Sequence, residues 1–106
     1  MSPTARVIYE VNLDIDAAIR AEYLDWLAAH VEEIGALPGF LGAQVLEIAD
    51  PPAAPGRIGL CVQYRLSGQP ALDAYLAEHA PRLRADRIAR FGGRFTASRR
   101  VLATLS

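Results

Sequence analysis

Two segments of this chain combine one continuous apolar row with a second, more polar row, and this alternation constrains the fold most. Residues 6–13 (RVIYEVNL) and 57–66 (RIGLCVQYRL) both follow the pattern. Successive side chains of a β-strand point to opposite faces, so each segment is predicted to be a strand with one buried face. Other elements must cover the apolar rows, whereas the polar rows need no such cover from the chain itself.

A long helix between these strands is expected to provide part of that cover. Apolar side chains recur there at every third or fourth position, which is typical of an amphipathic helix. These positions are Ile19, Tyr23, Leu27, Val31 and Ile34. Asp16 precedes the stripe and can accept hydrogen bonds from free backbone N–H groups, while Gly35 and the Pro38-Gly39 pair are expected to end the helix.

The remaining elements follow from breaking residues and from shorter patterns. Ser67 and Pro70 predict the start of a second helix, which Pro81 should break or kink because proline lacks a backbone N–H. A further helical piece, residues 82–91, ends at Gly92-Gly93. Residues 40–49 and 95–105 are predicted strands, and residues 50–56 (DPPAAPG) are predicted to form a stiff loop.

The predicted order is therefore strand–helix–strand–strand–helix–strand in a single domain spanning residues 1–106. This is an α+β, ferredoxin-like arrangement, with a four-stranded antiparallel sheet that carries its helices on one face. The other face stays open in an isolated subunit. Hydrophobic residues make up 52% of the chain, which is rich for a small monomer and favours a homodimer with a buried partner surface.

Charge is unevenly distributed along the chain. Residues 1–81 contain 11 acidic side chains and 4 arginines, whereas residues 82–106 contain 7 arginines and only Asp86 as an acid. Such asymmetry can indicate a surface for anions or nucleic acid. The interpretation we favour is that two parts of the fold, or two subunits, attract each other.

The cellular compartment is predicted from the single cysteine and from the first residues of the chain. Cys61 is the only cysteine, so it excludes an internal disulfide and favours a reducing compartment. The start, residues 1–6, does not read as a secretory signal, and no apolar run is long enough to span a membrane. A cytoplasmic location is therefore expected.

Several longer runs resemble a known family. They are IYEVNLDID at residues 8–16, EYLDWLAAHV at 22–31, LPGF at 37–40, QYRL at 63–66, YLAEHAPRLRAD at 75–86 and FGGRFTASRRVL at 91–102. Together they resemble a bacterial family of unknown function within the dimeric α/β-barrel superfamily. The resemblance implies a fold similar to that of cofactor-independent monooxygenases, haem-degrading enzymes and stress-response barrel proteins. It also implies that two subunits pair their sheets, open face to open face.

The open sheet face is the predicted site, because its polar side chains converge there. The candidate ligand-binding residues are Glu10, Asn12, Gln63, Arg65 and Arg100. Neighbouring residues of a strand point oppositely, so either Arg99 or Arg100 faces this surface. Two interpretations remain open: a cavity for a small molecule, or a polar dimer interface in which Glu10 pairs with Arg65 or Arg100.

Catalytic candidates are weaker. The side chains considered are His79, His30 and Trp26. A packing role is the simpler explanation for Trp26 and His30, and hydrogen bonding to the last carbonyls of a helix is the simpler one for His79. In an oxygenase-like enzyme, Asn12 and Gln63 would donate to an oxyanion, Arg65 or Arg100 would anchor an anion, and His79 would be the base. A non-enzymatic module that binds a small molecule or a partner is favoured, since no nucleophile, base and orienting group can be assembled.

Other classes of site are disfavoured by the residues themselves. The two histidines and one cysteine are scattered, so no metal site is expected, and no motif implies a cofactor. RNA-recognition domains of the same strand order stack bases on aromatic side chains of the third strand, where this chain has Gly59 and Cys61. Nucleic-acid binding is therefore not expected, and Cys61 is interpreted as a packing residue.

Overall fold

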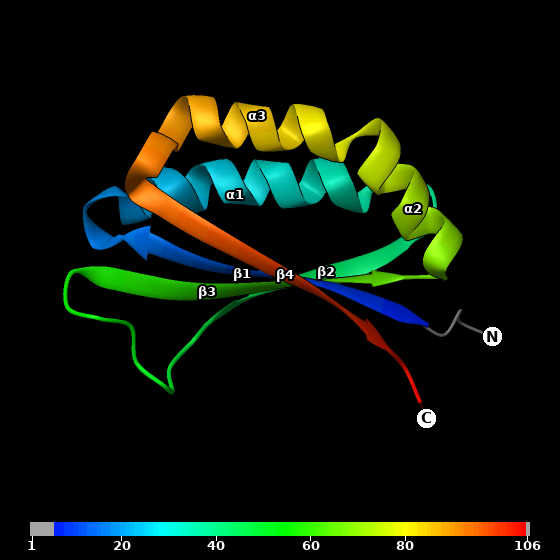
Figure 1. The fold of residues 1–106 in the computed structure, drawn as a ribbon, viewed down its shortest axis with the longest axis horizontal. Helices are drawn as coiled ribbons and strands as arrows, with labels where there is room; N and C mark the ends of the chain where they lie inside the picture. Colours follow the sequence, from blue (N-terminus) through cyan, green and yellow to red (C-terminus); the bar gives the residue numbers. More distant parts are fainter. Residues whose placement is uncertain (1–5, 106) are drawn as a thin grey trace.

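The computed structural model, which describes residues 6–105, contains the predicted four-stranded sheet with helices on one face (Figure 1). The sheet order is β2-β3-β1-β4, and every neighbouring pair is antiparallel. The strands are β1 (Val7–Asp16), β2 (Phe40–Glu47), β3 (Arg57–Leu66) and β4 (Phe95–Ala103). The helices are α1 (Arg20–Gly35), α2 (Gln69–Glu78) and α3 (Ala80–Phe91), with short 3-10 turns η1 (Ala17–Ile19) and η2 (Gly92–Arg94). The fold is α+β and ferredoxin-like, as predicted.

Strand β1 is central in the sheet and divides its side chains between two environments. One row lies under the helices and is buried. Its members are Val7, Tyr9, Val11, Leu13 and Ile15. Their partners on β3, from Ile58 to Leu66, continue the same apolar layer, which also receives Tyr23 and Leu27 from α1. The hydrophobic core therefore lies between the helices and one face of the sheet.

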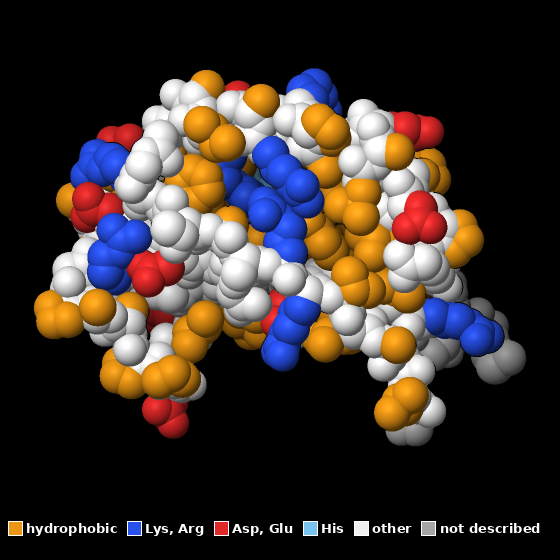
Figure 2. Space-filling model, in the orientation of Figure 1, with side chains coloured by type: hydrophobic (Ala, Val, Ile, Leu, Met, Phe, Trp, Pro, Cys, Tyr) orange, Lys and Arg blue, Asp and Glu red, His pale blue; other side chains and the backbone are white. Residues whose placement is uncertain are grey.

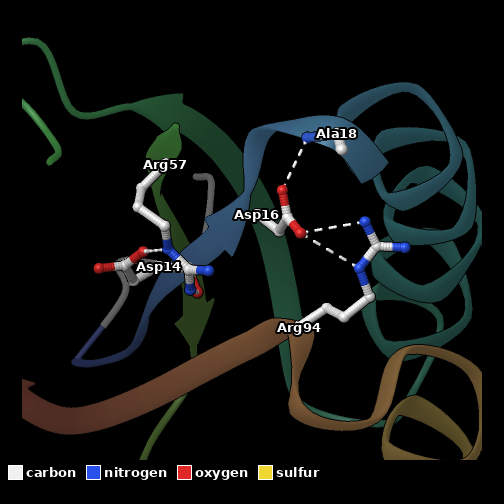
Figure 3. A network of polar contacts seen from close by, with 5 residues as sticks. All are labelled: Asp14, Asp16, Ala18, Arg57 and Arg94. Atoms are coloured by element: carbon white, nitrogen blue, oxygen red, sulfur yellow. Dashed lines mark hydrogen bonds and ion pairs between the residues drawn. The ribbon is translucent and has the colours of Figure 1, made fainter. Parts of the chain in front are cut away.

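The start of α1 depends on the predicted cap, Asp16. Its carboxylate accepts a hydrogen bond from the backbone N–H of Ala18 at 2.9 Å, so η1 and then α1 begin directly after β1. The same carboxylate accepts from Arg94 of η2, at 3.0 Å from its Nη2 (Figure 3). Beside it, Arg57 donates through Nε to Asp14 at 2.7 Å. One cluster thus joins the ends of β1, β3 and η2.

The buried face of α1 differs from the prediction at one position. Ile19, just before the helix, and Tyr23, Leu27 and Ile34 are buried as expected, but His30 is buried in place of Val31. Val31 is only half-buried. The apolar spacing could not distinguish these neighbours, since a histidine can also lie on a buried helix face when a partner satisfies it.

The predicted break between the second and third helices is confirmed. α2 ends at Glu78 and α3 begins at Ala80, so Pro81 lies in the first turn of α3. A proline is tolerated there because the first N–H groups of a helix have no intrahelical acceptor. Strand limits differ slightly from the prediction: β1 continues to Asp16, whereas β2 ends at Glu47 and β4 at Ala103.

The segment between β2 and β3 lies on the side of the sheet opposite the helices (Figure 1). It contains the proline-rich residues 50–56 that were predicted to form a loop. Within residues 6–105, no helix is both long and apolar enough to cross a membrane. The expectation about a secretory signal concerns residues 1–6, and residues 1–5 lie outside the described part.

Core packing gives a first prediction. Leu27 is 1% exposed and packs in the core, so Leu27→Ala should lower the free energy of unfolding by about 2–5 kcal/mol through lost burial and a residual cavity. Leu105→Ala removes the same atoms from a side chain that is 97% exposed, and should change the free energy of unfolding by less than about 0.5 kcal/mol. Urea unfolding of both variants measures the difference, and equal effects would contradict the described core.

Candidate functional site

A buried carboxylate lies at the centre of the sheet face that the helices leave uncovered. Glu10 is on β1, in the row opposite the core, and is only 2% exposed. Its Oε1 accepts from Gln63 Nε2 at 2.9 Å, and its Oε2 accepts from Asn12 Nδ2 at 3.0 Å. Arg100 Nε forms an ion pair and hydrogen bond with the same Oε2. Four of the five predicted ligand-binding residues therefore belong to one network.

These donors hold Glu10 in its charged form. The hydrogen bond from Arg100, followed by those from Asn12 and Gln63, lowers the pKa of the Glu10 carboxyl from 4.5 to about 2, against the opposing effect of burial. The same charge acts on Cys61, opposite Asn12 on β3. Burial first, and then the Glu10 carboxylate, raises the pKa of the Cys61 thiol, so a thiolate nucleophile is disfavoured there.

Strand register decides between the two adjacent arginines of β4. Arg100 is opposite Glu10 and Arg99 is opposite Val11, so Arg100 faces the open surface and Arg99 faces the helix side. The fifth predicted residue, Arg65, faces the open surface but does not join the network. Its guanidinium lies over Gly42 of β2, where any Cβ would overlap it. Of the two predicted partners for Glu10, the one observed is Arg100, within the same subunit.

Apolar cross-strand pairs flank the Glu10 network on the open face. Ile8 is opposite Leu102 on one side, and Cys61 is opposite Leu46 on the other. Leu46 is 37% exposed, and the other three are half-buried. The face thus has a polar, internally satisfied centre between two partly exposed apolar borders.

A groove of about 470 Å³ lies beside this network on the same face. Asn12, Gly59 and Ser98 form part of its floor, and Pro51 and Ala53 of the loop between β2 and β3 form a wall. Most of its lining is apolar, and Asp14 is its charged member. Sequence reasoning found Asn12 but not the wall, because DPPAAPG predicts a loop without indicating over which strand the loop folds.

The aromatic and histidine candidates on α1 lie on the other side of the sheet. Trp26 and His30 stack with ring centroids 4.5 Å apart, and Trp26 Nε1 donates to Asp86 of α3 at 3.2 Å. Arg87 Nη2 lies 3.3 Å from His30 Nε2. Burial, and then the charge of Arg87, lower the pKa of His30 to about 4, so His30 is neutral at pH 7 and accepts this hydrogen bond.

His79 belongs neither to the Glu10 network nor to the Trp26–His30 pair. It lies between α2 and α3, where its backbone N–H donates to the Tyr75 carbonyl at 2.9 Å and its own carbonyl accepts from Leu83 at 3.2 Å. Asn12 is on the opposite face of the sheet. The residues that an oxygenase-like mechanism would combine, Asn12, Trp26 and His79, are therefore not brought together within one subunit.

Comparison with known proteins assigns the family. Residues 6–105 match the domain of unknown function DUF4286. The chain belongs to this family. None of the curated proteins matches the DUF4286 chain in sequence.

Solved structures confirm the fold. SnoaB, a cofactor-independent oxygenase from Streptomyces nogalater, is similar with a TM-score of 0.70 and 16% identity, covering 96% of each chain. The haem degrader MhuD from Mycobacterium tuberculosis, solved with two haems in its active site, has a TM-score of 0.65 and 22% identity, covering 94% of this chain and 96% of its own. A protein of unknown function from Nitrosomonas europaea has a TM-score of 0.68 and 15% identity, covering 99% of this chain and 94% of its own. At these identities the likeness concerns the fold alone.

Neither the open-face groove nor His30 fits a haem. The groove of about 470 Å³ is lined by no histidine, cysteine, tyrosine or methionine that could be an axial ligand. His30 is buried against Trp26, and the Arg87 guanidinium occupies the position next to its Nε2. A cation at that nitrogen would oppose coordination of a metal ion.

The Glu10 network predicts a specific dependence of stability on pH. The folded-state pKa of Glu10 lies below its unfolded value, so its contribution is fully present above pH 4.5 and is lost as pH falls towards about 2. Glu10→Gln should lower the free energy of unfolding by roughly 1–3 kcal/mol at pH 7, since it removes a charged acceptor from three donors.

Urea unfolding of the native chain and Glu10→Gln at pH 7 and pH 3 measures this effect. The difference between the two proteins should shrink at pH 3, because the other carboxylates are common to both. An unchanged difference would contradict a Glu10 carboxyl that stays ionised in the folded protein.

Proposed function

We propose that this DUF4286 protein is a cytoplasmic homodimer of single-domain chains whose paired open sheet faces bind a small molecule. The observation that carries the proposal is the composition of that face: a satisfied, buried carboxylate between partly exposed apolar pairs, beside a groove of about 470 Å³. Covering partly exposed apolar pairs with another surface removes them from water and so lowers the free energy. The family resemblance implies the same pairing of sheets.

The internal pairing of Glu10 supports this arrangement. A charge that entered an interface without partners would cost several kcal/mol, whereas Glu10 already has three donors within its own subunit. Covering the face therefore removes apolar side chains such as Leu46 and Leu102 from water without leaving the buried carboxylate unpaired.

The groove favours a neutral ligand with an apolar body. Its polar groups include the side chains of Asn12, Thr96 and Ser98, while Ile48, Pro51 and Ala53 provide apolar contact. No arginine or lysine is among its described lining residues, and its one carboxylate, Asp14, is already paired with Arg57, so the groove offers an anion no free cation. A volume of this size suits a compact organic molecule. Binding is favoured over catalysis because the amide groups of Asn12 and Gln63 are already committed to Glu10.

The dimer can be tested with two adjacent residues of β2. Leu46 and Val45 are 37% and 41% exposed, but Leu46 faces the open surface with Cys61 and Val45 faces the helix side with Val62. The native chain should sediment with about twice the 11.5 kDa mass of one chain. Leu46→Arg should weaken the dimer by at least about tenfold, because it buries an unpaired charge.

Val45→Arg adds the same charge on the other face and should leave the dimer intact. Sedimentation equilibrium across a concentration series measures all three proteins. A monomeric native chain at micromolar concentration, or equal weakening by both substitutions, would overturn the proposed interface.

The groove can be tested by reducing its volume. A Cβ at Gly59 would make only ordinary contacts with Ile48, the nearest at 3.4 Å, so a larger side chain can enter the groove there. Naphthol, a neutral apolar probe with one hydroxyl, should shift the backbone amide resonances of Gly59 and Ser98 in the native chain. Gly59→Val should weaken this binding by about tenfold, and undiminished binding would exclude the groove as its site.

A further inference from the structure

Three arginines gather on the helix side of the sheet, away from the proposed groove. Arg84 and Arg87 come from α3, and Arg99 comes from β4. They line both a small enclosed cavity of about 10 Å³ between helices and sheet and an open groove of about 310 Å³ between α3 and β4. Figure 2 shows basic side chains grouped in the middle of the view between these two elements, with hydrophobic side chains around them.

None of the three has a carboxylate partner within residues 6–105. The ion pairs found there involve Arg20, Arg57, Arg82, Arg94 and Arg100. Arg84 instead donates to the Tyr9 hydroxyl at 3.2 Å, and Arg87 donates to His30. Positive charges held close together without an acid raise the free energy of the folded chain, so an anion that joins them would be bound favourably.

Arg87 is the strongest indication of a missing partner. It is only 5% exposed, and its Nε is buried without a hydrogen-bond acceptor. Buried charged groups are almost always paired, since an unpaired one is costly. The guanidinium nevertheless keeps a defined place, because its carbon lies 5.1 Å from the centre of the Trp26 ring and 5.8 Å from that of Phe95.

The neighbours of Arg87 fix this position without forming an ion pair with it. His30 is neutral and accepts one N–H of Arg87, and Asp86 is occupied by Trp26 at 3.2 Å. The Arg87 guanidinium is therefore held in a fixed orientation with no carboxylate in contact with it among the described residues. Pre-orientation reduces the entropy lost when a ligand binds, which favours a specific site over a diffuse basic surface.

We propose that the groove between α3 and β4 binds the oxyanion group of a small organic acid, either a carboxylate or a phosphate monoester. Arg84, Arg87 and Arg99 hold the anionic oxygens, which forked guanidinium groups bind well. Ile88, which is 61% exposed, and Phe95 form apolar walls for the body of the ligand. A groove of about 310 Å³ is large enough for a compact organic acid. This site is independent of the dimer and of the open-face groove.

The test uses the full chain, isotope-labelled for NMR, and three probes that share one ring system: naphthoate, naphthyl phosphate and naphthol. At least one of the two anions should shift the backbone amides of Ile88 and Gly92 in a saturable manner, and naphthol should not. The tighter of the two anions identifies the carboxylate or the phosphate as the preferred group. Binding of neither at millimolar concentration, or equal shifts with naphthol, would overturn the proposal.

A matched pair of substitutions separates the site from general charge attraction. Arg99→Gln and Arg90→Gln each remove one positive charge from an exposed side chain, but only Arg99 lines the groove. Arg99→Gln should weaken anion binding by about tenfold, the effect of losing a charged hydrogen bond, and Arg90→Gln should change it little. Arg84→Gln provides a second variant with the same expected loss. Equal effects of Arg99→Gln and Arg90→Gln would overturn the proposal.

Discussion

The alternation of side chains along β1 is the constraint on which the rest of this structure depends. The strand pairs with both β3 and β4, so its register sets which side chains of three strands lie under the helices. One row enters the core, and the other carries Glu10 and Asn12 on the open face. A slip of one residue would exchange the rows and place the Glu10 carboxylate in the core, so the network and the core specify the same register.

The sequence predicted the architecture well because its strongest signals are local and periodic. The row from Ile58 to Leu66, the cap at Asp16 and the break before Pro81 depend on neighbours within a few residues. Strand ends were less accurate, since pairing partners determine where a ladder stops. β1 extends to Asp16 because Arg57 lies opposite it, which the pattern of residues 6–13 alone does not show.

The site was predictable only in part, for three physical reasons. Convergence of Glu10, Asn12 and Gln63 follows from strand alternation, but the choice of Arg100 over Arg99 and Arg65 depends on the register of β4 and on the position of Arg65 over Gly42. The position of His30 in the core depends on a partner 57 residues away, Arg87, which no local pattern indicates. The wall at Pro51 and Ala53 depends similarly on how a loop folds back over the sheet.

The uneven charge of the chain has two different structural consequences. Of the arginines in residues 82–106, Arg82, Arg94 and Arg100 pair with Glu33, Asp16 and Glu10, which all lie in the acidic first part. Attraction between two parts of the fold thus accounts for these three. Arg84, Arg87 and Arg99 have no acidic partner among the described residues, although Glu10 lies on the same strand as their neighbour Tyr9.

The sheet itself causes this separation. Because Glu10 and Tyr9 point to opposite faces, the carboxylate pairs with Arg100, and the sheet separates it from the three arginines on the helix side. The charges are therefore paired differently on the two faces: one side of β1 holds a fully paired acid, and the other holds a buried cation with an unpaired N–H. An anion in the groove between α3 and β4 would provide the three arginines that line it with the acidic partner that the described residues do not supply.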